Sequence, residues 1–589
     1  MRLQSPIHSM SDPSDSLPTV SAESTGRRRA AGEWAIAALV SLAAALAVVA
    51  PFFFLGTASG HDVAFHMASW LDAAGQWKQG VIFPRWAEWA NFGFGEPRFI
   101  FYPPLSWLFG AFLGSSVPWT WVAATFNICV QAFAGLSVFV LLRRLAAQRF
   151  AAFFGAACFA ANPYSLLIIY VRSDFAELLA IAFFPLLFLA ILQLSSELPA
   201  ADRSRFRDVF FFALPFCAIW LSNAPAAVIA TYSSALWFVL AALRNRSMAA
   251  LGRGAAGLSL GFGLAGFYLI PAIYEQRWVN IYRALAVGLT PADNFLYATT
   301  SNAEHDVFNR TASNVAVLLI LWTLAAAVAA WRLNFATGVK FSRQITLPAV
   351  TLGVAAIVLM LPVTMVFWHH LPELRFVQFP WRWMSVLALC AVIFTALSTR
   401  VWLRWIWLII IPLAIVGTAH YLVKNTWWDT EDMPTLEAAV TNGTGFEGTD
   451  EYDPVGDDHT DLPQKEERAV LLRTPGDVDA HREARVFVDQ WSAERRRVRV
   501  SARRPVRLAL RLMNYPAWRA TLNGEPVVAQ HPVGTQQMIV AIPAGDSELR
   551  IEFTRTTDRT IGGWVSIISI VASSRVFFWK RRESRTAGS

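Results

Sequence analysis

Residues 34–55 read WAIAALVSLAAALAVVAPFFFL, an apolar run without a charged side chain. A membrane-spanning helix needs ~20 such residues to cross ~30 Å of hydrocarbon, so this run predicts a span. Runs of the same kind recur along the chain, and the predicted spans are 34–55, 120–142, 151–170, 175–194, 209–223, 225–243, 254–273, 312–331, 346–368, 383–398, 402–422 and 560–579. The sequence therefore predicts an α-helical polytopic membrane protein with about 12 spans.

The composition of the chain supports this fold class. Of its 589 residues, 55% are hydrophobic and 16% are charged, whereas a soluble protein has ~25% charged residues. These values exclude a soluble multidomain protein, a disordered chain and a collagen-like chain. The cysteines all lie in apolar runs, which argues against a disulfide framework or a cysteine zinc site. The net charge of +8 resides largely in arginines of short loops and termini, so it predicts no nucleic-acid partner.

The distribution of Arg and Lys predicts the orientation of the spans. Cytoplasmic loops carry an excess of these residues, and every predicted inner loop is basic when both termini are cytoplasmic. Residues 1–30 are polar, end in three arginines and are predicted to be a disordered cytoplasmic tail. A cleaved signal peptide is disfavoured because the following run is long enough to span and lacks an A-x-A cleavage site. The stretch 101–114 would invert all later loops as a span, so it is predicted to be an interfacial or re-entrant outer helix.

The domain prediction follows from these spans. Residues 31–423 form the transmembrane domain, with a long outer loop at 56–119. An extracytoplasmic region, 424–558, precedes a final transmembrane helix at 559–580 and a cytoplasmic tail at 581–589. Within the extracytoplasmic region, alternating residues predict strands at 485–489, 497–502, 506–513, 517–522, 525–530, 537–542 and 548–553, with an Asn523-Gly524 turn. Such strands predict a small β-sandwich that binds or packs, and 429–483 is predicted to be loop.

The first outer loop carries the main functional candidate, Asp62. A helix from this residue to about Gln79 places Phe65 on one side and His66 with Asp72 on another, as in an amphipathic helix on the membrane surface. Asp62 lies at the start of this helix, where aspartate often caps free N–H groups. It is equally a carboxylate held just outside the bilayer, able to take a proton from an acceptor hydroxyl or to bind a metal ion. The two roles do not exclude each other.

The same loop carries a set of short motifs. They are His61-Asp62-x-x-Phe65-His66, Pro84-Arg85-Trp86, Asn91-Phe92-Gly93-x-Gly95 and Phe101-Tyr102-Pro103-Pro104-Leu105. Together they resemble the bacterial 6-pyruvoyl-tetrahydropterin synthase-related membrane proteins, which look like a branch of the GT-C glycosyltransferases. The resemblance runs from about residue 34 to 400. A C-terminal segment, Asn514-Tyr515-Pro516-x-Trp518, is similar to the end of another GT-C-like group.

The resemblance implies an activity and a location. It implies a multi-pass protein of the bacterial inner membrane that transfers a sugar from a polyprenyl-phosphate carrier to a glycan, lipid or protein acceptor on the outer face. The acidic residue of the first outer loop is usually essential in GT-C enzymes, and Asp62 matches that position. A lipid-phosphate donor enters from the membrane, so no soluble nucleotide and no Gly-rich phosphate loop is needed.

The other candidates are substrate-binding residues on the outer side. They are His61, His66, Arg85, Arg172, Asp174, Glu177, Arg375 and Arg382. Arg172 and Glu177 lie at the edge of the hydrocarbon, where an unpaired charge is costly, and are expected either to pair with each other or to bind substrate. Arg375 and Arg382 suit a lipid phosphate, or else contact headgroups as interfacial arginines.

Metal binding and two other functions remain open. His369 and His370 are adjacent but have no evident third ligand, so no cofactor is predicted and a divalent metal is only an option. A transporter or flippase of lipid-linked saccharides should carry ionisable residues near mid-membrane and paired broken helices. The charges lie mainly at the outer edge, which favours an enzyme. A non-catalytic membrane scaffold is the third possibility.

Overall fold

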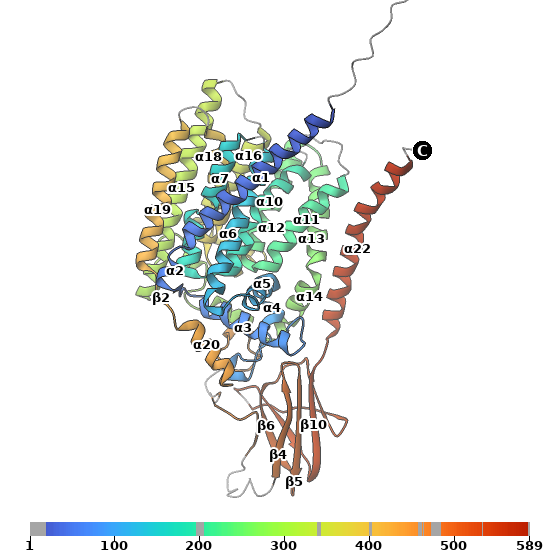
Figure 1. Cartoon of the computed structure of the whole chain (residues 1–589). Helices are drawn as coiled ribbons and strands as arrows, with labels where there is room; N and C mark the ends of the chain where they lie inside the picture. Colours follow the sequence, from blue (N-terminus) through green and yellow to red (C-terminus); the bar gives the residue numbers. More distant parts are fainter. Residues whose placement is uncertain are drawn as a thin grey trace, which may run out of the picture.

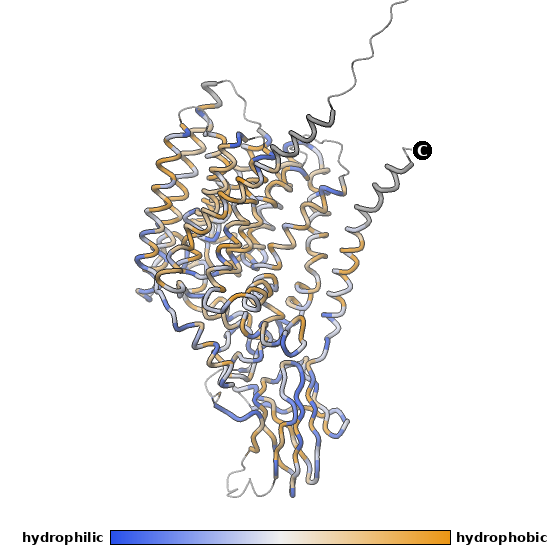
Figure 2. Tube along the Cα trace, viewed as in Figure 1, coloured by the Kyte–Doolittle hydropathy of each residue, from blue (hydrophilic) through white to orange (hydrophobic). Residues whose placement is uncertain are grey.

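The protein forms a bundle of long helices with β-sheets at one end (Figure 1). The computed structural model describes residues 19–145, 147–195, 205–337, 343–399, 403–457, 462, 465–472, 484–532 and 534–586. Figure 2 shows hydrophobic residues along the helices and hydrophilic residues gathered at the helix ends and in the sheets. The start of α1 (Thr19–Val49) and the end of α22 (Thr557–Thr586) lie on the side opposite the sheets. This arrangement agrees with two termini on one side of a membrane.

Eight helices in the described part of the chain are long and apolar enough to cross a membrane. They cover Ala31–Leu55, Trp119–Arg144, Arg149–Arg172, Phe175–Leu194, Ala224–Asn245, Ala303–Leu333, Pro380–Ser398 and Leu403–Asn425. Each coincides with a span predicted from the sequence. The helical membrane architecture is therefore confirmed.

Two further predicted spans are broken. Helix α13 (Ala249–Leu264) meets α14 (Gly266–Glu275) at 78°, and α16 (Arg343–Leu359) meets α17 (Met365–His370) at 93°. With each bent pair taken as one span, the described residues give ten spans. The two remaining predicted spans coincide with α11 (Arg205–Ser222), which lies within the bundle, and with α22, which lies at its edge; neither is in this count. Three charged residues in the first turn of α11 lower its mean hydropathy, so twelve spans remain a prediction.

The bend between α13 and α14 frees backbone groups that α22 satisfies. The Ser566 hydroxyl accepts from the N–H of Phe267 at 2.9 Å and lies 3.1 Å from the carbonyl oxygens of Gly263 and Leu264. Backbone groups inside a bilayer must find partners within the protein. Below the bend, the buried Glu275 carboxylate accepts two hydrogen bonds from Arg559, at 2.7 and 2.8 Å. Helix α22 therefore contacts the bent pair α13–α14 at two positions, one at the bend and one at Glu275.

The C-terminal strands form two sheets, as predicted. The larger has the order β4-β5-β10-β7-β8 and the smaller β3-β6-β9, and their inner faces share one buried apolar cluster. The strands are β3 (Ala469–Leu471), β4 (Ala484–Ser492), β5 (Arg495–Ala502), β6 (Val506–Met513), β7 (Trp518–Leu522), β8 (Glu525–Val527), β9 (Gln537–Ile542) and β10 (Gly545–Phe553). Asn523 and Gly524 join β7 to β8 with φ of 52° and 91°, the left-handed backbone that an Asn-Gly hairpin turn requires.

Two polar segments are more ordered than predicted. Helix α1 already begins at Thr19, so residues 19–30 are helical and not a disordered tail, whereas 1–18 lie outside the described residues. The stretch predicted to be loop contains α20 (Asp432–Thr441) and β3, and it follows β2 (Trp428–Asp429). Strand β2 pairs with β1 (Thr57–Ala58), which stabilises the segment that precedes α20. The beginning of the first outer loop is thereby tied to the end of α19 (Leu403–Asn425).

Helix α3 (Val63–Lys78) lacks the water-facing polar side of the predicted amphipathic helix, because that side is also buried, whereas its position on a membrane surface stays a prediction. Asp72 accepts from the Gln76 side chain at 2.7 Å and from the Trp89 N–H at 3.1 Å. The polarity of this side thus serves internal hydrogen bonds. The short apolar helix α5 (Pro104–Gly114) packs against α3 and is too short to cross a membrane, in line with its exclusion from the spans.

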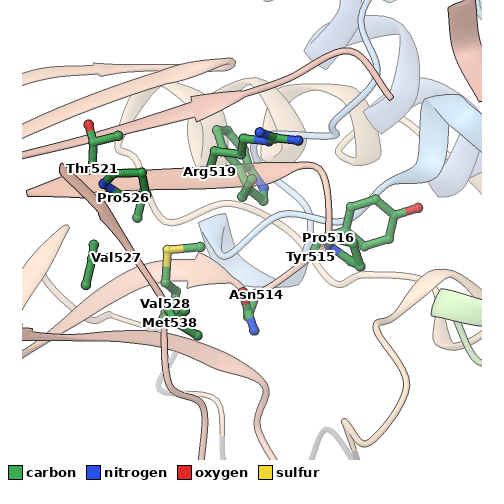
Figure 3. Close-up of a pocket in the computed structure, with 12 residues that line it drawn as sticks. Asn514, Tyr515, Pro516, Arg519, Thr521, Pro526, Val527, Val528 and Met538 are labelled. Atoms are coloured by element: carbon green, nitrogen blue, oxygen red, sulfur yellow. The ribbon is translucent and has the colours of Figure 1, made fainter. Parts of the chain in front are cut away.

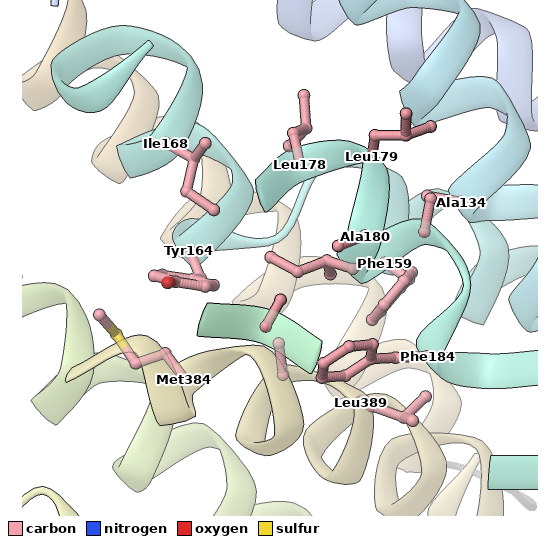
Figure 4. Close-up of a cluster of buried hydrophobic side chains, with 14 of the residues drawn as sticks. Ala134, Phe159, Tyr164, Ile168, Leu178, Leu179, Ala180, Phe184, Met384 and Leu389 are labelled. Carbon is pink, nitrogen blue, oxygen red and sulfur yellow. The ribbon is translucent and has the colours of Figure 1, made fainter. Parts of the chain in front are cut away.

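Apolar side chains of several helices pack together in the interior of the bundle (Figure 4). Phe159 of α7 (Arg149–Ala160), Phe184 of α10 (Phe184–Leu194) and Leu389 of α18 (Met384–Ser398) are all buried there. Tyr164 of α8 (Pro163–Leu167) lies in the same cluster. This core fixes the outer ends of α8, α9 (Phe175–Ala182) and α18, which carry the charged residues described next.

Candidate functional site

Two turns distant in sequence lie against each other at the end of the bundle nearer the C-terminal sheets (Figure 1). The N–H of Asp62 donates to the Arg172 carbonyl at 2.9 Å, and the N–H of Gly60 donates to the Ser173 hydroxyl at 3.0 Å. A Cβ on Gly60 would come within 2.5 Å of the Val171 carbonyl oxygen, so only glycine allows this approach. The contact places the first outer loop directly beside the turn before α9.

The local backbone of that turn gathers three charged residues. A π-helical turn, Ile168–Arg172, ends at Ser173, whose φ of 53° is left-handed. Asp174 then begins α9, and its carboxylate accepts from the N–H of Glu177 at 2.9 Å. The extra residue of a π turn shifts the direction of a helix. Arg172, Asp174 and Glu177 consequently all enter one charge cluster.

Asp62 precedes the first turn of α3 but does not cap it. Its side chain makes no capping hydrogen bond with the helix. Instead it accepts a hydrogen bond from Nη2 of Arg172 at 2.5 Å. The Asp62 side chain is 30% exposed, whereas the Asp174 and Glu177 side chains are fully buried. The interpretation as a simple helix cap is therefore wrong, and a role outside the helix remains open.

Arg382 completes the cluster from the opposite side. It donates to Glu177 at 3.0 Å and to Asp174 at 3.2 Å, and Glu177 also accepts from the Tyr164 hydroxyl. The predicted pairing of Arg172 with Glu177 is thus wrong. Arg172 pairs with Asp62 because the π turn directs it outward, and Arg382 from η8 (Pro380–Trp383) takes the inner carboxylates.

His66 approaches Asp174 from α3. Its Nε2 lies 3.6 Å from a carboxylate oxygen of Asp174, and the imidazole is buried. Burial would raise the pKa of the Asp174 carboxyl, but His66, Arg382 and Arg172 outweigh burial and hold this pKa below its usual range. The lowered pKa favours the anionic form of Asp174, which contacts His66, Arg172 and Arg382.

Aromatic rings border the charges. The guanidinium groups of Arg172 and Arg382 each lie 4.8 Å from the centre of the Phe379 ring, a cation–π distance. On the outer side, the His61 ring meets Phe308 edge-on, with 4.7 Å between centroids. Partial burial, and then the positive charge of Arg172, lower the pKa of the His61 imidazole even though its ring reaches the surface. Both effects disfavour the charged imidazolium form of His61.

Comparison with known proteins gives one family match. A model described as "6-pyruvoyl-tetrahydropterin synthase related domain; membrane protein" matches residues 99–424, more than half of the chain. The chain belongs to this family. The match confirms the family predicted from the motifs, and it includes Arg172, Asp174, Glu177 and Arg382. Asp62 and His66 precede the matched residues.

Solved structures with similarity to this family member include two cryo-EM structures of the arabinofuranosyltransferase AftD from Mycobacteria, one of them a mutant. Their sequence identities are 15% and 16%, each with a TM-score of 0.41. The alignments cover 66% and 70% of this chain but only 27% and 29% of the AftD chains. Comparison with curated proteins gives no match.

Two predicted site residues lie apart from the cluster. Arg85 stacks on Phe83 at 4.6 Å, in a part of the family member where the first outer loop meets the C-terminal region. Burial, and then the charge of Arg559, lower the pKa of Arg85 to about 10. Arg375 is exposed and stacks on Tyr282 at 5.3 Å. Substrate binding by these two arginines stays a prediction.

The described residues contain no group of three or more His, Cys, Asp or Glu side chains placed to hold a metal ion. Nδ1 of His370 lies 2.8 Å from the Val366 carbonyl oxygen, a contact within its own helix.

The sequence did not identify three contributors to the site. Tyr164 bonds Glu177, Phe379 lies between the two arginines, and Gln378 accepts from Arg382 at 3.3 Å. Gln378 has a φ of 64°, and the Ser173 backbone is left-handed too. Strained backbone of this kind is enriched at functional sites, but the presence of Gln or Ser in a sequence does not predict it. Of the three, only Phe379 has a distinctive sequence context, since it directly precedes Pro-Trp-Arg-Trp at 380–383.

A second polar network joins the first outer loop to the C-terminal region. Asn91 donates to Asp453 at 2.6 Å, and Arg98 lies 2.5 Å from Glu96, which also accepts from the N–H of Thr449 at 2.8 Å. Arg511 of β6 donates to the Gly443 carbonyl at 2.8 Å. These contacts stabilise the loop that holds Asp62 and do not reach the charge cluster.

Proposed function

We propose that this protein is a GT-C-type glycosyltransferase that moves a sugar from a polyprenyl-phosphate-linked donor to an acceptor at the outer face of the bacterial inner membrane. The observation that carries the proposal is the position of Asp62: a partly exposed carboxylate, bonded to an arginine, at the outer end of the membrane helices. A base for an acceptor hydroxyl and a cation for a phosphate are then adjacent.

The reaction balances with these groups. The acceptor hydroxyl oxygen attacks the anomeric carbon of the donor while the bond from that carbon to the phosphate oxygen breaks. The phosphate departs with the bonding electron pair, and Asp62 takes the hydroxyl proton. Asp174 and Arg382 touch neither reactant in this scheme, since both are buried and bonded to each other. They position Arg172 and the start of α9.

The test is Asp62→Asn in a strain that lacks the chromosomal copy. We expect loss of glycan transfer with normal abundance and membrane insertion, read out as the glycan and lipid profile of the cells. Asp489→Asn is the matched control, because it also removes an Asp–Arg pair on the C-terminal region, at 2.6 Å from Arg499. Full transfer by Asp62→Asn at normal abundance rules out the catalytic assignment.

A second candidate function is a flippase of lipid-linked saccharides. The two bent helix pairs favour it, because paired broken helices are a feature of transporters. Reconstituted protein distinguishes the two functions. A flippase moves a labelled lipid-linked sugar between leaflets of a liposome without an acceptor, and a transferase leaves its leaflet distribution unchanged and consumes it only when an acceptor is added.

A further inference from the structure

Arg172 has hydrogen-bonding capacity that the folded protein does not use. Its Nη2 bonds Asp62, but its Nε is buried and has no hydrogen-bond partner among the described residues. Arg382 differs in this respect, because Nε, Nη1 and Nη2 all donate to protein oxygens. An unsatisfied buried donor is costly. The guanidinium of Arg172 is thus the one in the cluster with a donor left for a ligand.

The cluster has no surplus positive charge to attract an anion. Asp62, Asp174 and Glu177 face two guanidinium groups. Two of the carboxylates are almost fully buried, with 4% and 1% of their side chains exposed, and these are held by Arg382. Asp62 alone of the three reaches water. An anion that binds Arg172 must therefore compete with Asp62, which is free to turn outward.

We propose that Asp62 is the resting counter-ion of Arg172 and that a phosphate group of a lipid-linked ligand displaces it. The inference rests on the proposed function and deepens it by naming the residue that recognises the phosphate. A phosphate has several acceptor oxygens and can engage Nη2 and the idle Nε together, in the bidentate geometry that guanidinium groups favour.

The exchange links ligand binding to the availability of the base. While Asp62 accepts the short hydrogen bond from Arg172, one of its carboxylate oxygens is occupied. Once the phosphate takes Arg172, that oxygen is free to accept from the acceptor hydroxyl. Phe379 holds the guanidinium by stacking throughout the exchange, because a ring contact does not depend on which anion is bound.

The test measures binding without transfer. The full chain in nanodiscs is titrated with farnesyl phosphate by calorimetry, with farnesol and inorganic phosphate as parallel ligands. We expect Asp62→Asn to bind farnesyl phosphate about ten-fold more tightly than wild type, because a competing negative charge is removed from Arg172. Arg172→Gln should lose binding, and the double variant should bind as weakly as Arg172→Gln.

Controls separate folding and ligand source. Arg172→Lys keeps the cation but not the idle Nε, so it should bind more weakly than wild type while eluting as the same folded species. Asp489→Asn should not change the affinity. Unchanged or weaker binding by Asp62→Asn, or a gain that persists in the double variant, overturns the exchange. Equal affinity for inorganic phosphate overturns the lipid source.

Failure of the exchange and failure of the proposed function give different results. Loss of transfer by Asp62→Asn without tighter binding leaves the base assignment standing and removes the exchange. Tighter binding by Asp62→Asn together with full transfer supports the exchange and removes the assignment of Asp62 as the base.

Discussion

Arg382 and Glu177 are separated by 205 residues in sequence and lie 3.0 Å apart in the folded protein, with 4% and 1% of their side chains exposed. A charge in such a place is stable only when it is paired. Arg382 thus joins the turn before α18 to α9, through Glu177 and also through Asp174 at the start of that helix.

Arg382→Ala should destabilise the protein severely. It leaves Asp174 and Glu177 buried without their main counter-ion, which costs about 3–5 kcal/mol in comparable buried pairs. Thermal unfolding in detergent measures the effect. Arg375→Ala is the control, since Arg375 is exposed and stacks only on rings, and its effect should stay within about 0.5 kcal/mol. Similar losses for the two variants would contradict the structural role of Arg382.

Asp174→Asn and Asp62→Asn should differ in stability. Asp174 contacts two arginines and caps α9, so its loss should cost about 2–4 kcal/mol. Asp62 is partly exposed and caps nothing, so its ion pair should contribute about 1 kcal/mol or less. Chemical unfolding of both variants at one pH tests this order. A larger loss for Asp62→Asn would assign that residue a structural role.

Because of Asp72, the free energy of unfolding should fall as pH rises. Burial raises its pKa from 3.8 to about 7, even though Gln76 and Trp89 donate to it. The folded state therefore holds a proton that the unfolded state releases near pH 4, and this stabilisation is lost as pH climbs to about 7. The loss amounts to ~4 kcal/mol at most.

Asp72→Asn removes the titrating group and provides the measurement. The difference in unfolding free energy between wild type and Asp72→Asn should favour wild type most at pH 5 and shrink by pH 8. Parallel pH profiles for the two proteins would show that Asp72 does not bind a proton in this range.

Ser566→Ala should weaken the contact between α22 and the bent helices. The change removes the acceptor of the Phe267 N–H and the hydroxyl beside the Gly263 and Leu264 carbonyls. Hydrogen bonds between membrane helices contribute about 1 kcal/mol, so a modest fall in unfolding temperature is expected. Ser573→Ala removes a hydroxyl that bonds only within its own helix and should behave as wild type. Equal effects would mean that the bend does not need α22.

The sequence predicted the elements of this fold better than their contacts. The strand limits at Val506–Met513 and Gln537–Ile542 were predicted to the residue, because alternation and turn residues are local signals. The burial of α3 was not predicted, because the groups that cover its polar side, among them Trp89, Arg98 and Asp174, are brought there by the fold of the chain and not by a local pattern. The breaks at Ala265 and after Leu359 were also missed, since a hydropathy run carries no information on direction.

For the candidate site too, the sequence predicted the residues better than their contacts. The charged residues were recognised by their positions next to spans, and the structure brings Asp62, Arg172, Asp174, Glu177 and Arg382 together with His66. Their pairing depends on a π turn and a left-handed Ser173, which residue types do not encode. Arg85 and Arg375 were plausible by charge alone, and only the three-dimensional path of the chain separates them from the cluster.

The contacts between the first outer loop and the C-terminal region have a consequence for biogenesis. Asn91 donates to Asp453, which lies 362 residues later in the sequence, and the Phe92 carbonyl accepts from Arg511, which lies 419 residues later. Pairings this distant in sequence form slowly. During synthesis the segment that presents Asp62 emerges before Asp453 and Arg511 and stays without these partners until both have been made. A product that ends before Asp453 would therefore leave the Asn91 amide and the Phe92 carbonyl without these partners.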